Sequence, residues 1–226
     1  MLIFICGAYV CVRVLAAWLA EVAHVRDPAR FCDQVWQLAC HGAMLAWESR
    51  LLPMADPWQC NAREEWADFF EAQVSMWVFM LMLTVLVEIP RRDYVAMVLH
   101  HVLTISLTLV AMRGTGQGPA IVILFVHDAS DVLLDLTKLA NYLQLGRTTS
   151  ALFMLSTYVT WPMLRLWTLP WLIDQYTCGP WWVTGALRIL VCLHLYWWAL
   201  MNRIAYRMWT GQTAQHAARA EYDEST

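Results

Sequence analysis

The chain has 226 residues, of which 60% are hydrophobic and only 15% are charged, and its formal net charge is -3. Soluble globular domains average about 45–50% apolar and about 25% charged residues, so this composition excludes a water-facing surface of ordinary make-up. The 14 tryptophans fit a chain that packs against lipid, since tryptophan favours the membrane interface, and nothing in the sequence suggests a nucleic-acid-binding surface.

Seven stretches are read as membrane-spanning helices, which need about 20 mostly apolar residues. In chain order they cover residues 1–20, 31–52, 66–89, 94–112, 119–143, 149–171 and 181–206. The second and fifth are the least apolar, so we expect them to lie inside the bundle. The first has no basic stretch before its apolar run, which indicates a spanning helix rather than a cleaved signal peptide. The sequence therefore predicts an all-α polytopic membrane bundle of about seven helices, followed by a disordered tail over residues 209–226.

Arginines mark one side of the membrane in this arrangement, since short loops rich in Arg and Lys stay cytosolic. They follow the first, third, fifth and seventh predicted helices: Arg26, Arg30, Arg91, Arg92, Arg147, Arg203 and Arg207. This pattern predicts a cytosolic carboxyl terminus and an amino terminus on the opposite side. Cys60 and Cys178 both fall in loops on that opposite side, where they can form a disulfide if the compartment is oxidising.

Ionisable side chains inside spanning helices are costly and usually functional, and two consecutive predicted helices concentrate them. The fourth carries His100 and His101, and the fifth carries His127, Asp128, Asp131, Asp135, Lys138 and Asn141. At about 1.5 Å of rise per residue, the histidine pair lies roughly 12–14 Å inside one face, and the first two aspartates lie roughly 14–18 Å inside the other, so they share a depth. Spacings of three and four put the three aspartates and Lys138 on one side of the helix, where Lys138 can offset Asp135. We therefore expect a polar cavity inside the bundle.

Imidazoles beside carboxylates in such a cavity suit acyl transfer. A buried histidine can act as a base or as a nucleophile, and a neighbouring carboxylate fixes its tautomer and raises its basicity. A cavity that excludes water also suppresses hydrolysis of an activated acyl group. The structural alternatives are a satisfied interior histidine and an aspartate that hydrogen-bonds between helices. An adjacent histidine pair and several acids at one depth favour a functional role.

A metal site is the competing functional interpretation, since histidine and aspartate are metal ligands. The other histidines inside predicted helices, His41 and His194, each stand alone, so we expect no metal and assign both to packing or hydrogen bonding. Arg165 is expected toward the non-cytosolic face, where it snorkels or pairs with an acid in a structural role.

Two segments resemble a known family. Residues 91–104, RRDYVAMVLHHVLT, and residues 127–142, HDASDVLLDLTKLANY, are together similar to the Lag motif of ceramide synthases within the TLC-domain family. Weaker similarity extends the resemblance to about residues 30–208, which leaves residues 1–29 as an N-terminal helix and loop. The resemblance implies a barrel-like core of six helices around a central cavity, to which the N-terminal helix is added.

The resemblance also implies an activity. Ceramide synthases are enzymes of the endoplasmic reticulum membrane that join a fatty acyl group from acyl-CoA, a co-substrate, to the amine of a sphingoid base such as sphinganine, without a further cofactor. The motif implies a catalytic set of His100, His101, Asp128 and Asp131. We assign substrate-binding or supporting roles to Arg91, Arg92, His127, Asp135, Lys138 and Asn141. The family commonly has glutamate where Asp135 stands, which leaves the role of that residue open.

Other properties and functions stay open at this point. The acyl length is not determined, and neither is assembly into a homo- or heterodimer among the membrane lipids. A non-catalytic TLC-domain protein that senses lipid or assists translocation is the first alternative, which the complete histidine–aspartate set disfavours. A metal-dependent lipid oxidase or hydroxylase is the second, and metal analysis of the purified protein would separate it.

Overall fold

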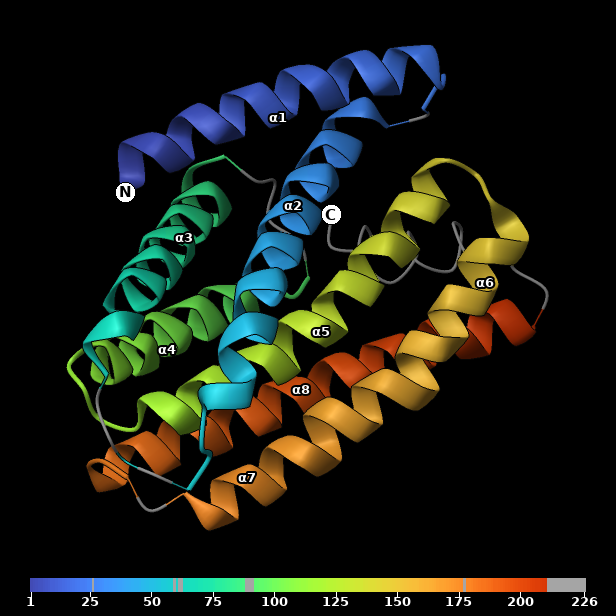
Figure 1. Cartoon of the computed structure of the whole chain (residues 1–226). Coiled ribbons are helices and arrows are strands. Elements are labelled where there is room, and N and C mark those ends of the chain that lie inside the picture. Colours follow the sequence, from blue (N-terminus) through green and yellow to red (C-terminus); the bar gives the residue numbers. More distant parts are fainter. Residues whose placement is uncertain (26, 59, 61–62, 88–91, 177, 211–226) are drawn as a thin grey trace.

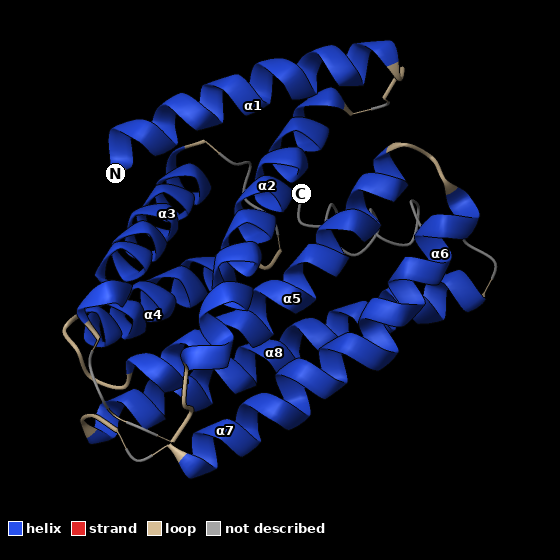
Figure 2. Ribbon diagram, in the orientation of Figure 1, coloured by secondary structure: helices blue, strands red, loops and turns tan. Residues whose placement is uncertain are grey.

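The computed structural model describes residues 1–25, 27–58, 60, 63–87, 92–176 and 178–210. These residues form helices and loops and contain no strand (Figure 2). The elements are α1 (Leu2–Val22), α2 (Pro28–Leu51), η1 (Leu52–Met54), η2 (Glu64–Trp66), α3 (Ala67–Leu86), α4 (Tyr94–Met112), α5 (Gln117–Tyr142), α6 (Gly146–Leu155), η3 (Ser156–Thr160), η4 (Pro162–Thr168), α7 (Leu169–Gln175) and α8 (Trp181–Trp209). The protein is an all-α polytopic membrane protein, as predicted.

The apolar helices and the polar helices have different places in this bundle. Within the described ranges, four segments are long and apolar enough to cross a membrane: α1, Glu64–Leu86, α4 and α8. Helices α2 and α5 are of similar length but more polar, and they bury many of their polar side chains. The predicted placement of these two helices inside the bundle is therefore confirmed.

The polar helices pack against each other, and so do two of the apolar ones. Helix α2 packs chiefly against α5, and α3 packs against α4. Helix α1 lies across the outside of α2 and α3, and α8 runs beside α4 and the α6–α7 column (Figure 1). Only Ala16 and Ala20 of α1 are buried, so most of its apolar surface faces outward. Such a surface is stable in lipid rather than in water.

The column from α6 to α7 widens into π-helical turns, η3 and η4. Pro162 begins η4 and supplies no backbone N–H, and its ring would clash with the carbonyl of an ordinary α-turn. Wide turns of this kind relieve the clash, and they are frequent at functional sites. Arg165 projects from η4 into the bundle and is 1% exposed.

One end of the bundle is closed by a disulfide between Cys60 and Cys178, whose Cα atoms are 5.4 Å apart. This bond joins the loop before α3 to the loop between α7 and α8. The sequence allowed this disulfide without deciding whether it forms. We call this end of the bundle the disulfide end. Gly118 touches the same region, where an added Cβ would lie 2.3 Å from the carbonyl oxygen of Asp56. Apolar side chains fill the interior nearby: Leu51, Phe69, Phe70, Ile121 and Leu124.

Candidate active site

A narrow cavity runs through the bundle interior between α4, α5 and α8 and encloses about 60 Å³ of free space. Its inner end is polar and is lined by His100, His127 and Asp131. Its wall toward the disulfide end is largely apolar and includes Leu107, Val110, Ala111, Ile123, Leu124, Val183, Leu187 and Leu190. Tyr176 lines the disulfide end, where burial raises the pKa of its phenol and keeps it neutral. The cavity therefore suits a molecule with an apolar chain and a reactive polar head.

The adjacent histidines of α4 face different surroundings. His100 lines the cavity, and its Nδ1 is enclosed in protein, so Nε2 is the ring atom that a ligand in the cavity can reach. His101 does not line the cavity, and its Nε2 lies 3.5 Å from Thr84 Oγ1 of α3. The indole ring of Trp77 packs against both imidazoles, with centroid separations of 6.0 and 5.6 Å. Of the predicted pair, His100 is the one placed to meet a substrate.

A chain of hydrogen bonds fixes the tautomers of two further histidines. Arg165 Nη1 lies 3.4 Å from His194 Nδ1 and 3.3 Å from His194 Nε2, and His194 Nε2 lies 3.0 Å from His127 Nε2. His127 Nδ1 lies 2.7 Å from the carbonyl oxygen of Ile123, which can only accept, so Nδ1 carries the proton. His194 then donates through Nε2 to His127 Nε2, and both imidazoles are neutral in this arrangement.

Arg165 also holds Asp131, which decides between the two roles expected for this arginine. Its Nη2 lies 2.6 Å from Asp131 Oδ1, its Nε donates to Ser130 Oγ at 2.6 Å, and its guanidinium carbon lies 4.8 Å from the centre of the Trp161 ring. Of the two expectations for Arg165, pairing with an acid in the bundle is confirmed and snorkelling to the membrane face is wrong. A guanidinium that finds a carboxylate and several acceptors inside the bundle has no need to reach water.

Asp135, the third aspartate on the polar side of α5, bonds to residues of α2 and not to a residue of its own helix. His41 Nδ1 lies 2.7 Å from Asp135 Oδ2, and Gln34 Nε2 donates to Asp135 Oδ1 at 2.6 Å. Lys138 is partly exposed and makes no ion pair with Asp135 or with any other residue among those the structure describes. The predicted pairing of Lys138 with Asp135 is therefore wrong, because α2 packs directly over Asp135 and supplies both of its partners. The assignment of His41 to hydrogen bonding is confirmed.

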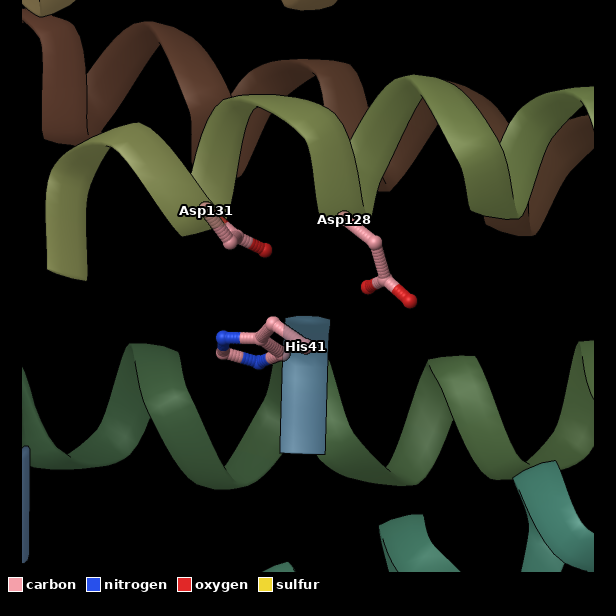
Figure 3. Close-up of side chains that lie close together, drawn as sticks. All are labelled: His41, Asp128 and Asp131. Atoms are coloured by element: carbon pink, nitrogen blue, oxygen red, sulfur yellow. The ribbon is translucent and has the colours of Figure 1, made fainter. Parts of the chain in front are cut away.

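Asp128 is fully buried and turns toward α2 (Figure 3). His41, Asp128 and Asp131 offer one ligand atom each within 4.8 Å of one another. A tetrahedral zinc ion at its usual bond lengths holds its ligand atoms about 3.3 Å apart. These three side chains could hold a divalent cation by closing in, with Asp131 offering the oxygen that Arg165 does not bind. The prediction of no metal stays a prediction.

The other predicted supporting residues lie outside this cluster. Arg92 is exposed at the start of α4 and lines a shallow hollow with Arg203 and Arg207, at the end of α4 opposite to the disulfide end. Asn141 is partly exposed near the end of α5, and no side-chain hydrogen bond from it is found within the described ranges. Arg91 lies outside the described residues.

The sequence was compared with protein families and with known proteins. A model of the TLC domain matches residues 30–203. The chain belongs to the TLC-domain family. It is 27% identical to human ceramide synthase 5 over 87% of this chain and 56% of the human protein. It is 26% identical to ASC1-like protein 3 of rice over 76% of this chain and 70% of that protein, and 21% identical to the sphingosine N-acyltransferase lac1 of Schizosaccharomyces pombe over 97% of this chain and 66% of that protein. The chain thus spans little more than half the length of the human relative.

Two buried polar residues beside the predicted site, Glu48 and Gln73, were not predicted from the sequence. The signal that could have found Glu48 is its presence as an ionisable residue inside a predicted spanning helix, which is the same rule that singled out α5. His41, Arg165 and His194 were given structural roles, but the sequence shows each of them as an isolated polar side chain with no indication of its partner.

Proposed function

We propose that this TLC-domain protein is a ceramide synthase, which transfers a fatty acyl group from acyl-CoA to the amine of a sphingoid base. The observation that carries the proposal is the cavity, because an apolar passage ends at His100, His127 and Asp131. The apolar wall matches an acyl chain in polarity, and a carbonyl group at the polar end would lie beside the imidazole. The similarity to proteins named ceramide synthase and sphingosine N-acyltransferase supports the same activity.

The residues at the polar end have complementary roles in this scheme. His100 presents Nε2 to the cavity and serves either as the base that deprotonates the amine or as the acceptor of the acyl group. Asp131 bonds to Arg165 through Oδ1, which leaves Oδ2 to hold the incoming ammonium group. The amine forms the new C–N bond and the C–S bond breaks. Of the two protons that the ammonium group loses, the departing thiolate of coenzyme A takes one, and the other passes through His100 to solvent.

The surroundings favour this chemistry over hydrolysis. The wall of the cavity is largely apolar, which favours attack on an activated acyl group by the amine over attack by water. We propose that acyl-CoA is the only co-substrate and that no further cofactor takes part. We also propose a location in the endoplasmic reticulum membrane with a cytosolic carboxyl terminus, in line with the arginine distribution.

An assay with purified protein tests the proposal. Sphinganine and acyl-CoAs of several lengths are supplied, and the N-acylated product is measured by mass spectrometry. We expect ceramide formation by the wild type and a loss of about 100-fold or more in His100→Ala or Asp131→Ala, the scale of losing an acid–base group. His24→Ala, an exposed histidine in a turn, is the matched control and keeps the wild-type rate.

Two outcomes would contradict the proposal. A wild-type protein that binds lipid without turnover would indicate the non-catalytic alternative, and full activity in both site variants would remove the site from the reaction. Intact-protein mass spectrometry with acyl-CoA alone decides between the two roles of His100, since only a nucleophile gains the mass of the acyl group.

A further inference from the structure

Glu48 and Asp128 form an acidic pair beside the cavity that the scheme above does not use. Glu48 comes from the last turn of α2 and Asp128 from the middle of α5, and each is 0% exposed. Their carboxyl groups lie within hydrogen-bonding reach of each other. Two acids that meet across the interface of tightly packed helices, with no access to water, need an electrostatic explanation.

The donors around Glu48 can be assigned one by one. The Trp77 Nε1–H donates to Gln73 Oε1 at 2.9 Å, which orients the amide so that its nitrogen points toward Glu48. Gln73 Nε2 then donates to Glu48 Oε1 at 2.9 Å. Among the described residues, no donor reaches Glu48 Oε2 or either oxygen of Asp128. The two carboxyl groups are therefore left facing one another.

Ionised carboxylates only accept hydrogen bonds, so two of them in contact have no bond to share. They would also combine like-charge repulsion with the cost of removing both charges from water. One proton between them supplies the missing donor and leaves a single negative charge. The other charged groups near Asp128 do not replace this proton, because Asp131 is paired with Arg165 and His41 with Asp135.

We propose that Glu48 and Asp128 share one proton, and that Glu48 is the positioning residue that holds Asp128 beside the reacting groups. The shared proton rests on the burial of the two carboxyl groups and on their lack of other donors, whereas the positioning role rests on the proposed function. Asp128 lies within 4.8 Å of both His41 and Asp131, and Asp131 lines the cavity. A displaced Asp128 would therefore disturb the carboxylate that is to hold the amine.

Infrared spectroscopy tests the shared proton without any need for activity. Glu48→Gln replaces the acid by an amide that can still accept from Gln73 and donate to Asp128. We expect the wild type to show the C=O stretch of a protonated carboxyl group at neutral pH and E48Q to lose it. Glu71→Gln, which makes the same change at an exposed acid of α3, is the control and keeps the band. A wild-type spectrum without this band overturns the shared proton.

Ceramide formation tests the positioning role. E48A leaves Asp128 as a buried charge without a partner, so we expect a loss of about tenfold or more. E48Q restores the donor and recovers most of that activity. The ratio of E48Q to wild-type activity should also rise at alkaline pH, because the wild type can lose the shared proton and glutamine cannot.

The results separate the two proposals. E48A with the wild-type rate, or E48Q with a pH profile identical to that of the wild type, overturns the positioning role. The E48Q comparison still decides if E48A fails to fold. If the wild type forms no ceramide, the proposed function fails while the infrared result still decides the shared proton.

Discussion

Arg165 is the residue on which most of the polar interior converges. It bonds to Asp131, Ser130 and the backbone of His127, and it orients His194. A guanidinium is always charged and offers five donors in a fixed plane, so it can serve several acceptors at once. The neutral state of His194 and the free oxygen of Asp131 both follow from its position.

Removing this guanidinium should therefore be costly. Arg165→Ala leaves Asp131 as an unpaired and only partly exposed charge, and we expect it to lower the free energy of unfolding by up to about 3–5 kcal/mol, the scale of breaking a buried ion pair. The double variant with Asp131→Asn should recover much of this loss, because the uncompensated charge is gone. Thermal unfolding of the detergent-purified variants measures both effects. Equal stability of the single and double variants would contradict the proposed dependence on the Asp131 charge.

At the scale of elements, the α4–α5 connection depends on a close approach of backbones at the disulfide end. Gly116 has φ of 67° at the start of α5, and an added Cβ would lie 2.8 Å from the hydroxyl of Tyr176. Gly118 comes still closer to the backbone of Asp56. These contacts place α5 so that its acids face α2.

Gly118→Ala should disturb this placement. The new Cβ would overlap the Asp56 carbonyl, and backbone cannot move aside as a side chain can, so we expect a loss of about 1–3 kcal/mol in the free energy of unfolding. Gly185→Ala in α8 is the control, since nothing lies within 4 Å of its added Cβ. That control should be neutral or should stabilise the helix by about 1 kcal/mol. A G118A protein as stable as the wild type would show that the loop adjusts freely.

At the scale of the whole molecule, the Cys60–Cys178 bond ties two loops that are 118 residues apart in sequence. Closing so long a loop restricts the unfolded chain, which is worth about 2–5 kcal/mol in comparable proteins. The bond also crosses the end of the bundle at which Tyr176 and Gly116 line the cavity.

Removing the bond should lower stability without removing the fold. Cys60→Ser and Cys178→Ser should each unfold at a lower temperature than the wild type under oxidising conditions, and the difference should vanish after reduction. Cys192→Ser, at an exposed free cysteine of α8, is the control and should behave like the wild type. Peptide mapping without reductant should recover residues 60 and 178 in one cross-linked fragment, and their recovery as free thiols would contradict the bond.

The sequence by itself determined the elements and the chemistry carried on two of them. Hydrophobic stretches of membrane length and polar spacings of three and four residues are local properties, so they revealed the all-α bundle and the acids on one face of α5. The charge distribution and the segment lengths also placed Cys60 and Cys178 at the same end. His100 and Asp131 were predicted at a common depth, and the cavity brings them together.

Only the tertiary structure decided which partners complete the site. Asp135 bonds to His41 rather than to Lys138, Arg165 turns inward to Asp131, and Glu48 meets Asp128. These pairs join helices that are distant in the chain, and they depend on the order and rotation of the packed helices. Periodicity within one helix shows which face is polar, but it contains no information on which neighbour that face will meet.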